Sequence, residues 1–314
     1  MKVAIWGAGG IGCYYGARLQ QAGHDVLFIA RGAHLKAMQQ KGLKVEHETL
    51  EFDQPVDALS QEQWLQEHHC SEFDLIILAI KAGATSELMN ASKAWLEEGS
   101  CQILSLQNGV ENEALIAQTV GAERTLGGLA VRIGGHILEP GHVQARGVAQ
   151  VVFGQWPNQQ EQELCGGSVE ALRSTLKDAA IEAILSTDIR RELWRKLLIN
   201  NGVNPLSALT GLDTRQLTAH PVHGQVVYKM MEEAAQAANS EGVDLGQQDI
   251  DEMFKLISEF DAIKTSMLVD REKGRPLELD GITGAVLRRC HQGSGDALMT
   301  GFITELLKSE YDCD

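Results

Sequence analysis

Short apolar runs alternate with a glycine-rich turn over the first thirty residues. Residues 2–6 (KVAIW) form an apolar run that ends at the segment Gly7-Ala8-Gly9-Gly10-Ile11-Gly12. Residues 12–21 have helical character and stop at Gly23, and a second apolar run covers residues 25–30. The order strand, glycine turn, helix, strand predicts the βαβ unit of a parallel sheet.

The strand pattern continues to about residue 185. Residues 73–80 (FDLIILAI) are a continuous apolar run, which is typical of a strand covered on both faces. The other predicted elements are a strand at 101–106 closed by Gln107-Asn108-Gly109, several strands within 127–152 with turns at Gly134-Gly135, Pro140-Gly141 and Gly147, a helix at 171–180 and a strand at 183–185.

Beyond about Thr187 the spacing of apolar residues becomes helical. They recur three or four positions apart, as in Leu193, Leu197 and Leu198, and again in Val226 and Met230. The pattern therefore predicts an α/β, Rossmann-type dinucleotide-binding domain over residues 1–186 and an all-α domain over residues 187–314.

Composition excludes several classes of function. The chain has 314 residues and a formal net charge of −16, and 44% of its residues are hydrophobic. This length supports two folded domains. The acidic balance lacks the positive surface that nucleic acid requires, so we expect no nucleic-acid partner.

Neither membrane insertion nor export is expected. The apolar stretch 75–80 is six residues long, whereas a membrane-spanning helix needs about 20. The N-terminus runs directly into glycines and shows no signal-peptide pattern. The six cysteines contain no CxxC pair. We therefore expect reduced thiols and a cytoplasmic protein.

The glycine segment has the spacing GxGxxG, and its context makes it a candidate phosphate-binding turn. Gly7 permits a tight turn, Gly9 allows the backbone to approach a pyrophosphate, and Gly12 lets the helix pack on the strand. The amides at the helix N-terminus then face the anion. A glycine turn without a ligand is the alternative.

The end of the second strand bears on which dinucleotide is bound. NAD-binding domains commonly carry an acidic residue there, but this strand is followed by Arg31, Gly32 and His34. An arginine suits the 2′-phosphate of NADP(H). Lys81, after the 73–80 strand, could add a second positive charge. The alternatives are a solvated lysine and a surface arginine.

In the second half, Lys196, Asn200 and Asn204 are spaced four residues apart and would share one face of a continuous helix. Such a face could be a polar site. It could equally be a solvated face near a frayed helix end, since Gly202 and Pro205 lie nearby.

Other polar groups have plain structural explanations when taken alone. Glu278 and Asp280 could be carboxylates at a helix start, and Ser266 alone carries no signal. The pairs Glu97-Glu98 and Glu232-Glu233 are expected on solvated helix faces. The run His68-His69-Cys70 has nothing nearby to complete a ligand set, so no metal site is expected.

Together these residues resemble the ketopantoate reductase (2-dehydropantoate 2-reductase) family over nearly the whole chain. Its pattern comprises the glycine turn, an arginine, a lysine, an Asn-Gly pair, an LWRK-x3-N-x3-NPL block, a Ser-Met pair and a Glu-x-Asp-x3-Gly segment. The matching positions are Gly7 to Gly12, Arg31, Lys81, Asn108-Gly109, Leu193 to Lys196 with Asn200 and Asn204-Pro205-Leu206, Ser266-Met267, and Glu278, Asp280 and Gly284.

The resemblance implies a Rossmann domain followed by a helical domain, with the active site in the cleft between them. The implied reaction is the NADPH-dependent reduction of 2-dehydropantoate to (R)-pantoate, a step of pantothenate and coenzyme A biosynthesis. Lys196 matches the general acid, and Glu278 matches the acidic residue that helps place the lysine and the substrate. Asn108, Asn200, Asn204 and Ser266 match polar residues that fix the substrate's hydroxyl and carboxylate or the nicotinamide end.

The resemblance also puts Asn108 and Glu278 among the cofactor-binding residues, beside Gly7, Ala8, Gly9, Gly10, Ile11, Gly12, Arg31 and Lys81. Thr214 and Thr283 stand where some family members carry asparagine. The alternatives are a reductase of another branched 2-oxo acid or of an imine, and an NADP-binding regulator without catalysis. Both a monomer and a homodimer are compatible with the sequence.

Overall fold

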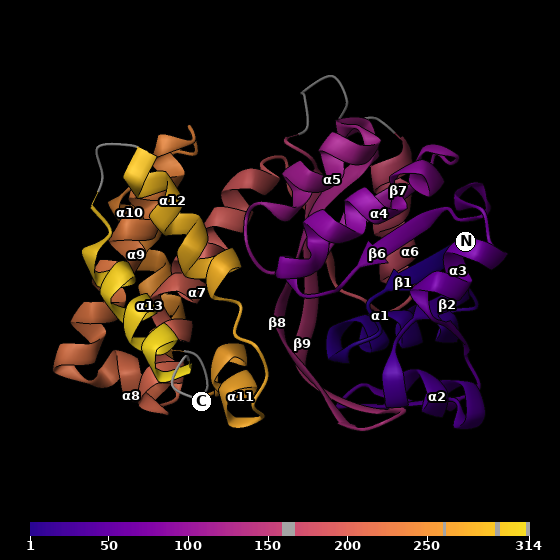
Figure 1. Cartoon of the computed structure of the whole chain (residues 1–314), viewed down its shortest axis with the longest axis horizontal. Helices are drawn as coiled ribbons and strands as arrows, with labels where there is room; N and C mark the ends of the chain where they lie inside the picture. Colours follow the sequence, from indigo (N-terminus) through magenta and orange to yellow (C-terminus); the bar gives the residue numbers. More distant parts are fainter. Residues whose placement is uncertain (159–166, 260–261, 293–295, 312–314) are drawn as a thin grey trace. The chain divides into compact units, whose positions relative to one another are not determined.

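The computed structural model describes residues 1–158, 167–259, 262–292 and 296–311. The chain forms two compact units (Figure 1). Unit 1 comprises Met1–Gln107 and Asn112–Ile189, and unit 2 comprises Asn108–Glu111 and the chain from Arg190 onward. The sequence pattern places the boundary between the two units near residue 186. That pattern gives no sign that the short segment Asn108–Glu111 groups with the helical unit.

Unit 1 is built on a ten-stranded mixed sheet with the strand order β4-β3-β9-β8-β7-β6-β1-β2-β5, and β10 pairs with β9. The strands are β1 (Lys2–Trp6), β2 (Asp25–Ile29), β3 (Leu43–His47), β4 (Leu50–Gln54), β5 (Asp57–Leu59), β6 (Leu75–Leu78), β7 (Gln102–Ser105), β8 (Thr125–Glu139), β9 (His142–Gln155) and β10 (Ala183–Leu185). The part β5-β2-β1-β6-β7-β8 is parallel, with the crossover at β1 that defines a dinucleotide-binding sheet.

Helices cover both faces of this sheet. They are α1 (Gly10–Gln21), α2 (Gly32–Lys41), α3 (Gln61–Glu67), α4 (Thr85–Glu97), α5 (Asn112–Val120) and α6 (Gly167–Asp178), with the 3-10 turns η1 (Cys70–Glu72), η2 (Ala82–Ala84) and η3 (Ala122–Arg124). Alternate residues of each strand enter different cores. In β1, Val3 and Ile5 pack with α1 and α6, whereas Ala4 and Trp6 pack with α3, α4 and α5. The predicted βαβ unit is confirmed.

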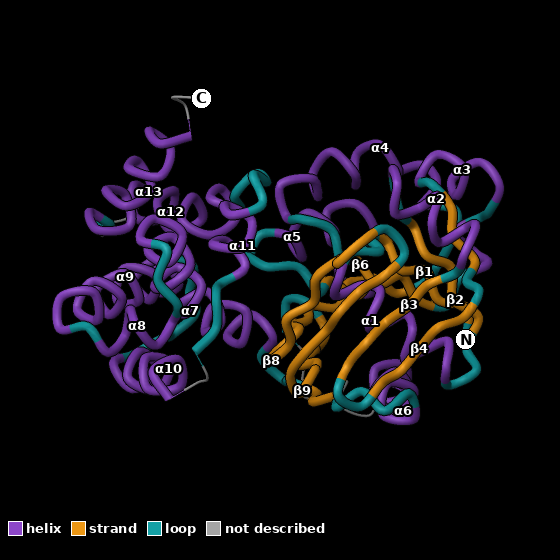
Figure 2. The backbone as a smooth tube through the Cα atoms, turned by 90° about the horizontal axis from the view of Figure 1, so that it is seen from below, coloured by secondary structure: helices purple, strands orange, loops and turns teal. Residues whose placement is uncertain are grey.

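The long hairpin β8–β9 corrects the prediction for residues 127–152 (Figure 2). Only Pro140-Gly141 forms a turn, whereas Gly134-Gly135 lies inside β8. A Cβ on Gly135 would lie 2.7 Å from the Gly10 carbonyl carbon, so this glycine permits close backbone packing. Gly147 has φ +103° and sits where the register shifts, at a β-bulge.

Strands β3, β4 and β5 and helices α2, α3 and α5 were not predicted. The strands have five residues or fewer, and the alternation of apolar and polar residues in β3 and β4 was not recognised as a strand signal. Unit 2 is helical, as predicted. Its elements are α7 (Ile189–Thr210), α8 (Thr214–Ala219), α9 (Pro221–Ser240), α10 (Gln247–Glu259), α11 (Ser266–Glu272), the π-helix η5 (Asp280–Gly284), α12 (Ala285–Gln292) and α13 (Leu298–Tyr311). Phe260, an apolar residue at helical spacing after Met253 and Ile257, lies outside the described residues. No described helix combines the length and apolar character of a membrane span.

Candidate active-site residues in the two units

The glycine turn connects β1 to α1 and is pinned to the end of β2. The amides of Gly7 and Ala8 donate to the Ile29 carbonyl at 3.3 and 2.9 Å, and the Gly9 amide donates to the Gly7 carbonyl at 2.8 Å. Gly7 has φ +113°, which favours glycine. Gly9 is the N-cap of α1, and because it has no side chain it forms no capping hydrogen bond with the first amides of the helix. The first amides of α1 are thus available to an anion.

The glycines of the turn differ in how much space surrounds them. A Cβ on Gly12 would lie 2.2 Å from the Gly7 carbonyl oxygen, so Gly12 closes the turn against the helix. A Cβ on Gly10 would lie 2.2 Å from the Gly135 carbonyl group of β8. A Cβ on Gly9 would meet nothing within 4 Å. Gly9 therefore borders open space, as backbone approach by a pyrophosphate requires.

Arg31 lies at the N-cap of α2, directly after β2, and its side chain is exposed.

His34 lies one turn further along α2, and the sequence pattern assigned no role to it. Its Nδ1 accepts from the Gly141 amide at 3.0 Å, and its Nε2 lies 3.5 Å from the Cys13 Sγ on α1. Burial lowers the pKa of His34, and a hydrogen bond to the Ala8 carbonyl opposes this shift. His34 thus connects the Arg31 loop with the glycine turn and the β8–β9 turn.

Lys81 follows β6, at the edge of the sheet that carries the glycine turn. The Ala79 backbone approaches so closely that a Cβ on Gly7 would lie 2.7 Å from its carbonyl carbon. Lys81 is exposed two residues later. The buried Gln107 holds this loop, since its Nε2 donates to the Ile80 carbonyl at 3.1 Å and to the Thr85 Oγ1 at 2.8 Å. Gln107 was predicted only as part of a strand end.

In unit 2, α7 is one helix of 22 residues that includes Pro205. It does not fray at Gly202, so Lys196, Asn200 and Asn204 lie along one helix face. Asn204 is buried, and Lys196 and Asn200 are half-buried. A Cβ on Gly202 would lie 3.0 Å from Met231 Cγ, so this glycine allows α7 to pack tightly against α9. The alternative in which the helix ends near Gly202 and Pro205 is therefore wrong.

The arginine of the LWRK segment binds its own unit. Arg195 contacts the buried Asp249 and also Glu252, whose Oε2 is 2.8 Å from its Nη2. Arg191 donates to the same Asp249 Oδ1 at 2.7 and 3.0 Å. Helix α7 is thereby fixed to α10 next to Lys196.

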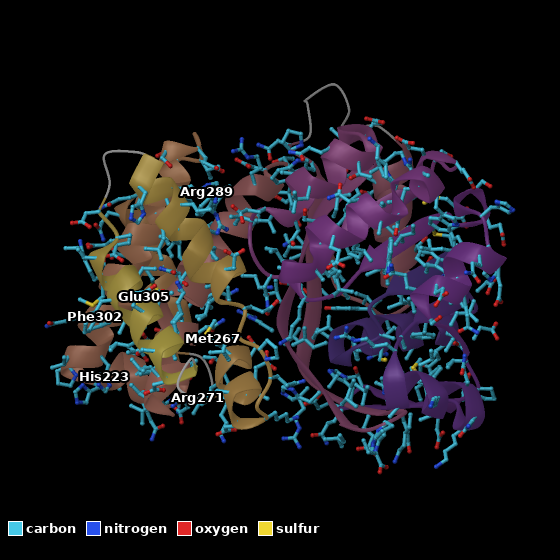
Figure 3. The ribbon with its side chains drawn as sticks, viewed as in Figure 1. His223, Met267, Arg271, Arg289, Phe302 and Glu305 are labelled. Atoms are coloured by element: carbon cyan, nitrogen blue, oxygen red, sulfur yellow. The ribbon has the colours of Figure 1, made fainter. Side chains whose placement is uncertain are left out.

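The segment Asn108–Glu111 meets the π-helix region of unit 2. The Asn108 Nδ2 donates to the Glu278 Oε2 at 3.4 Å, so two predicted site residues 170 positions apart come together. Glu111 accepts from Arg288 at 2.6 Å and from Arg289, labelled in Figure 3, at 2.8 Å. These contacts hold the segment Asn108–Glu111 against the helices of unit 2. They were not predicted, because the sequence alone does not pair a loop with a distant helix.

The remaining candidates have plain surroundings. Ser266 is exposed at the start of α11, behind its N-cap Thr265. Thr214 is buried at the start of α8, and its Oγ1 accepts from the Ile263 amide at 3.4 Å. The buried Thr283 donates to the Leu279 carbonyl at 3.0 Å within the π-helix region. Both threonines thus bond to nearby backbone.

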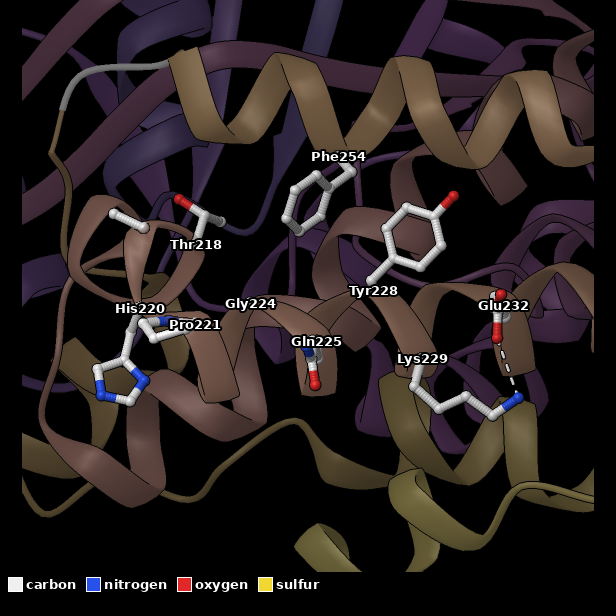
Figure 4. Close-up of a pocket in the computed structure, with 10 residues that line it drawn as sticks. Thr218, His220, Pro221, Gly224, Gln225, Tyr228, Lys229, Glu232 and Phe254 are labelled. Carbon is white, nitrogen blue, oxygen red and sulfur yellow. Dashed lines mark hydrogen bonds and ion pairs between the residues drawn. The ribbon is translucent and has the colours of Figure 1, made fainter.

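Helices α8, α9 and α10 form a groove of about 460 Å³ in unit 2. Figure 4 shows Tyr228 and Phe254 on its wall and the Lys229–Glu232 ion pair at one end. None of the predicted site residues lines this groove. It carries no part of the predicted chemistry.

Two expectations about charged and metal-binding residues can be compared with the structure. Glu233 is buried, not solvated, and accepts from the amides of Met299 and Thr300 at 3.0 and 2.8 Å. It caps α13, a role that a pair of adjacent glutamates does not reveal. His68 and His69 contact Glu72 and Glu98, and the described residues hold no cluster of three or more metal-ligand side chains.

Comparisons with known proteins identify the same family in both units. The family described as ketopantoate reductase PanE/ApbA matches residues 3–158, and its C-terminal counterpart matches residues 188–310. A 2-dehydropantoate 2-reductase of Mesorhizobium japonicum is 32% identical, covering 91% of this chain and 90% of the relative.

Solved structures give the same fold. The 2-dehydropantoate 2-reductase of Geobacter metallireducens superposes with a TM-score of 0.86 at 29% identity, covering 99% of this chain and all of that one. The ternary structure of a D-mandelate dehydrogenase with NADH and anilino(oxo)acetate has a TM-score of 0.88 at 24% identity, covering 100% of this chain and 99% of that one. The chain therefore belongs to the ketopantoate reductase family and is an oxidoreductase of the 2-dehydropantoate 2-reductase type.

Proposed function

We propose that this protein reduces 2-dehydropantoate to (R)-pantoate with NADPH. The observation that carries the proposal is the α7 face of Lys196, Asn200 and Asn204, present as one continuous helix and accompanied by the Asn108–Glu278 hydrogen bond. An ammonium group and carboxamides suit a substrate with a ketone, a hydroxyl and a carboxylate. The family relatives carry the name of this reaction.

NADP(H) fits the residues of unit 1. The uncapped α1 N-terminus and the open space beside Gly9 suit a pyrophosphate. The exposed Arg31 after β2 suits a 2′-phosphate, and no carboxylate follows β2 directly to repel it. When bound, the reduced nicotinamide supplies a hydride to the ketone carbon.

The protein's own contribution is a proton and a fixed geometry. Negative charge develops on the ketone oxygen as the carbon accepts the hydride, so a donor must face that oxygen. We assign this donor to the Lys196 ammonium, whose proton goes to the oxygen and is then replaced from solvent. Glu278 accepts a hydrogen bond from Asn108 and orients the Lys196 ammonium. Asn200, Asn204 and Ser266 hold the substrate's polar groups.

Steady-state oxidation of reduced nicotinamide tests the substrate and the cofactor together. Wild-type protein should show its highest kcat/KM with 2-dehydropantoate and NADPH. The panel includes other branched 2-oxo acids and an aryl 2-oxo acid, because a D-mandelate dehydrogenase shares the fold. A higher kcat/KM for the aryl acid, or for NADH, would contradict the proposal. NADPH binding without turnover of any substrate would indicate a regulator.

A further inference from the structure

Two buried cysteines lie side by side in unit 1, at the amino ends of neighbouring strands. Cys70 begins the turn η1 before β6, and Cys101 directly precedes β7. Their sulfur atoms are 3.4 Å apart, although the residues are 31 positions apart in sequence. Each follows an exposed residue, His69 or Ser100. Both cysteines are therefore buried but are next in sequence to an exposed residue.

The Arg124 guanidinium faces both sulfur atoms. Its Nη2 lies 3.8 Å from the Cys70 Sγ and 3.9 Å from the Cys101 Sγ. The Arg124 Nε and Nη1 donate to the carbonyls of Cys101 and Leu96 at 3.1 and 2.9 Å, which fixes the guanidinium in place. A fixed positive charge next to a thiol favours the thiolate, which is the nucleophilic form.

The two sulfur atoms have different roles in this cluster. A hydrogen bond from the Cys70 thiol, together with Arg124, lowers the pKa of Cys101 to about 7 against the opposing effect of burial. The same hydrogen bond and burial raise the pKa of Cys70. Cys101 is thus the sulfur that ionises near neutral pH, and Cys70 stays a thiol that donates to it.

The backbone keeps the pair together. Gly99 follows α4 and passes so close to Cys70 that a Cβ on Gly99 would lie 2.6 Å from the Cys70 Sγ. The chain between Gly99 and Cys101 is therefore packed directly onto the Cys70 turn. A disulfide requires the sulfur atoms to approach to about 2.05 Å, a movement of roughly 1.4 Å from their present separation.

We propose that Cys70 and Cys101 form an oxidation site that hydrogen peroxide converts into an intramolecular disulfide. The Cys101 thiolate attacks a peroxide oxygen, so an S–O bond forms, the O–O bond breaks and hydroxide leaves. The Cys70 sulfur then attacks the Cys101 sulfenic acid. The S–S bond forms, the S–O bond breaks, and the thiol proton leaves with the oxygen as water. The two thiols supply the two electrons.

Within unit 1, this site lies at the opposite strand ends from the candidate cofactor-binding residues, and the proposal does not rest on the proposed reaction. The strands β1, β6 and β7 are parallel, so the cysteines lie at their amino ends, whereas the glycine turn and Lys81 follow their carboxyl ends. The oxidised protein should therefore bind NADPH with the same Kd as the reduced protein.

Thiol counting on the whole chain tests the proposal. The reduced protein has six cysteines, and brief treatment with hydrogen peroxide, quenched with catalase, should lower the titratable thiols to four in denaturant. Peptide mass spectrometry should find Cys70 joined to Cys101, and dithiothreitol should restore all six thiols. Retention of six thiols, or loss of thiols without this linked peptide, would overturn the proposal.

Single substitutions separate the two sulfur atoms. In Cys70→Ser, dimedone should label Cys101 as a sulfenic acid, whereas Cys101→Ser should leave Cys70 unlabelled. Cys290→Ser removes another buried cysteine as the matched control, and it should still lose two thiols to the linked peptide. Equal labelling of Cys70 and Cys101 would contradict their assigned roles.

The Arg124 contribution has a measurable size. At pH 7, losing the combined effect of the Cys70 hydrogen bond and Arg124, and so restoring an ordinary pKa of about 8.5, would lower the Cys101 thiolate fraction about 15-fold, and the greater nucleophilicity of that thiolate would recover about fivefold. The Cys70 hydrogen bond is the larger of the two causes, so Arg124→Gln should slow the peroxide reaction by less than about threefold, and Arg124→Lys should restore most of the rate. An Arg124→Gln rate equal to or above that of wild type would contradict the role of Arg124.

Discussion

The carboxylate of Asp249 is expected to hold helix α7 against α10. Its side chain is 7% exposed and contacts two arginines of α7, Arg191 and Arg195. It also accepts from the Gly246 amide at 3.1 Å, at the start of α10. Asp249→Ala removes all of these contacts and leaves the two guanidinium groups without this partner.

The magnitude follows from the exposure of the partners. The side chains of Arg191 and Arg195 are 35% and 20% exposed, so water replaces part of each lost contact. We take about 1 kcal/mol for each arginine and about 1 kcal/mol for the Gly246 hydrogen bond, which totals about 3 kcal/mol. Asp249→Asn keeps an acceptor for Gly246 and should cost about 2 kcal/mol.

Urea denaturation followed by far-UV ellipticity measures this change, because unit 2 is helical. With a slope of about 1.5–2 kcal/mol/M, Asp249→Ala should lower the midpoint of the unit 2 transition by about 1.5–2 M. Asp251→Ala is the matched control, since Asp251 is exposed on the same helix and contacts Tyr228 and Gln247. Equal midpoints for Asp249→Ala and Asp251→Ala would refute the reasoning.

Three further predictions concern other parts of the chain. Glu233→Ala should lower the free energy of unfolding of unit 2 by about 2–3 kcal/mol in urea, because the buried cap of α13 is lost, and an unchanged midpoint would exclude this role. Arg31→Ala should raise the Kd of NADPH about tenfold more than that of NADH by fluorescence titration, and equal losses would show that Arg31 does not read the 2′-phosphate. Because burial lowers the folded-state pKa of His34, the unfolded chain binds the proton first, so unit 1 should lose stability as the pH falls below about 6.5. His34→Asn should flatten that pH dependence of the urea midpoint, and parallel curves for the two proteins would argue against the assignment.

The sequence predicted the parts of the fold that depend on local pattern. Two strands that are buried on both faces were predicted in this way. One lies in the continuous apolar run at 73–80, and the other is the run at 2–6 that precedes the glycine turn. Strands β3 and β4 carry the alternation of apolar and polar residues that is typical of a half-buried strand, so this signal could have found them, whereas β5 has only three residues. A glycine in the sequence can indicate either a turn or a close backbone contact. Gly135 was predicted as part of a turn, but it lies in the middle of a strand and permits close packing there.

The candidate site was predictable only where a motif is compact. Lys196 and its two asparagines share a helix face because the spacing itself determines the face. The Asn108–Glu278 contact and the Glu111–Arg289 clamp join residues 170 or more positions apart, and no local pattern encodes such pairs. Glu233 was misjudged because burial depends on which helix packs over it.

The central claim is that Lys196 supplies the proton in the reduction of 2-dehydropantoate. The most direct test compares kcat for wild type and Lys196→Ala at saturating NADPH and 2-dehydropantoate, with the Kd of NADPH measured for both. Lys229→Ala, which removes an exposed lysine of α9, serves as the control. The account predicts a kcat at least ~10²-fold lower for Lys196→Ala, with the NADPH Kd and the control unchanged. A kcat within twofold of wild type would contradict it.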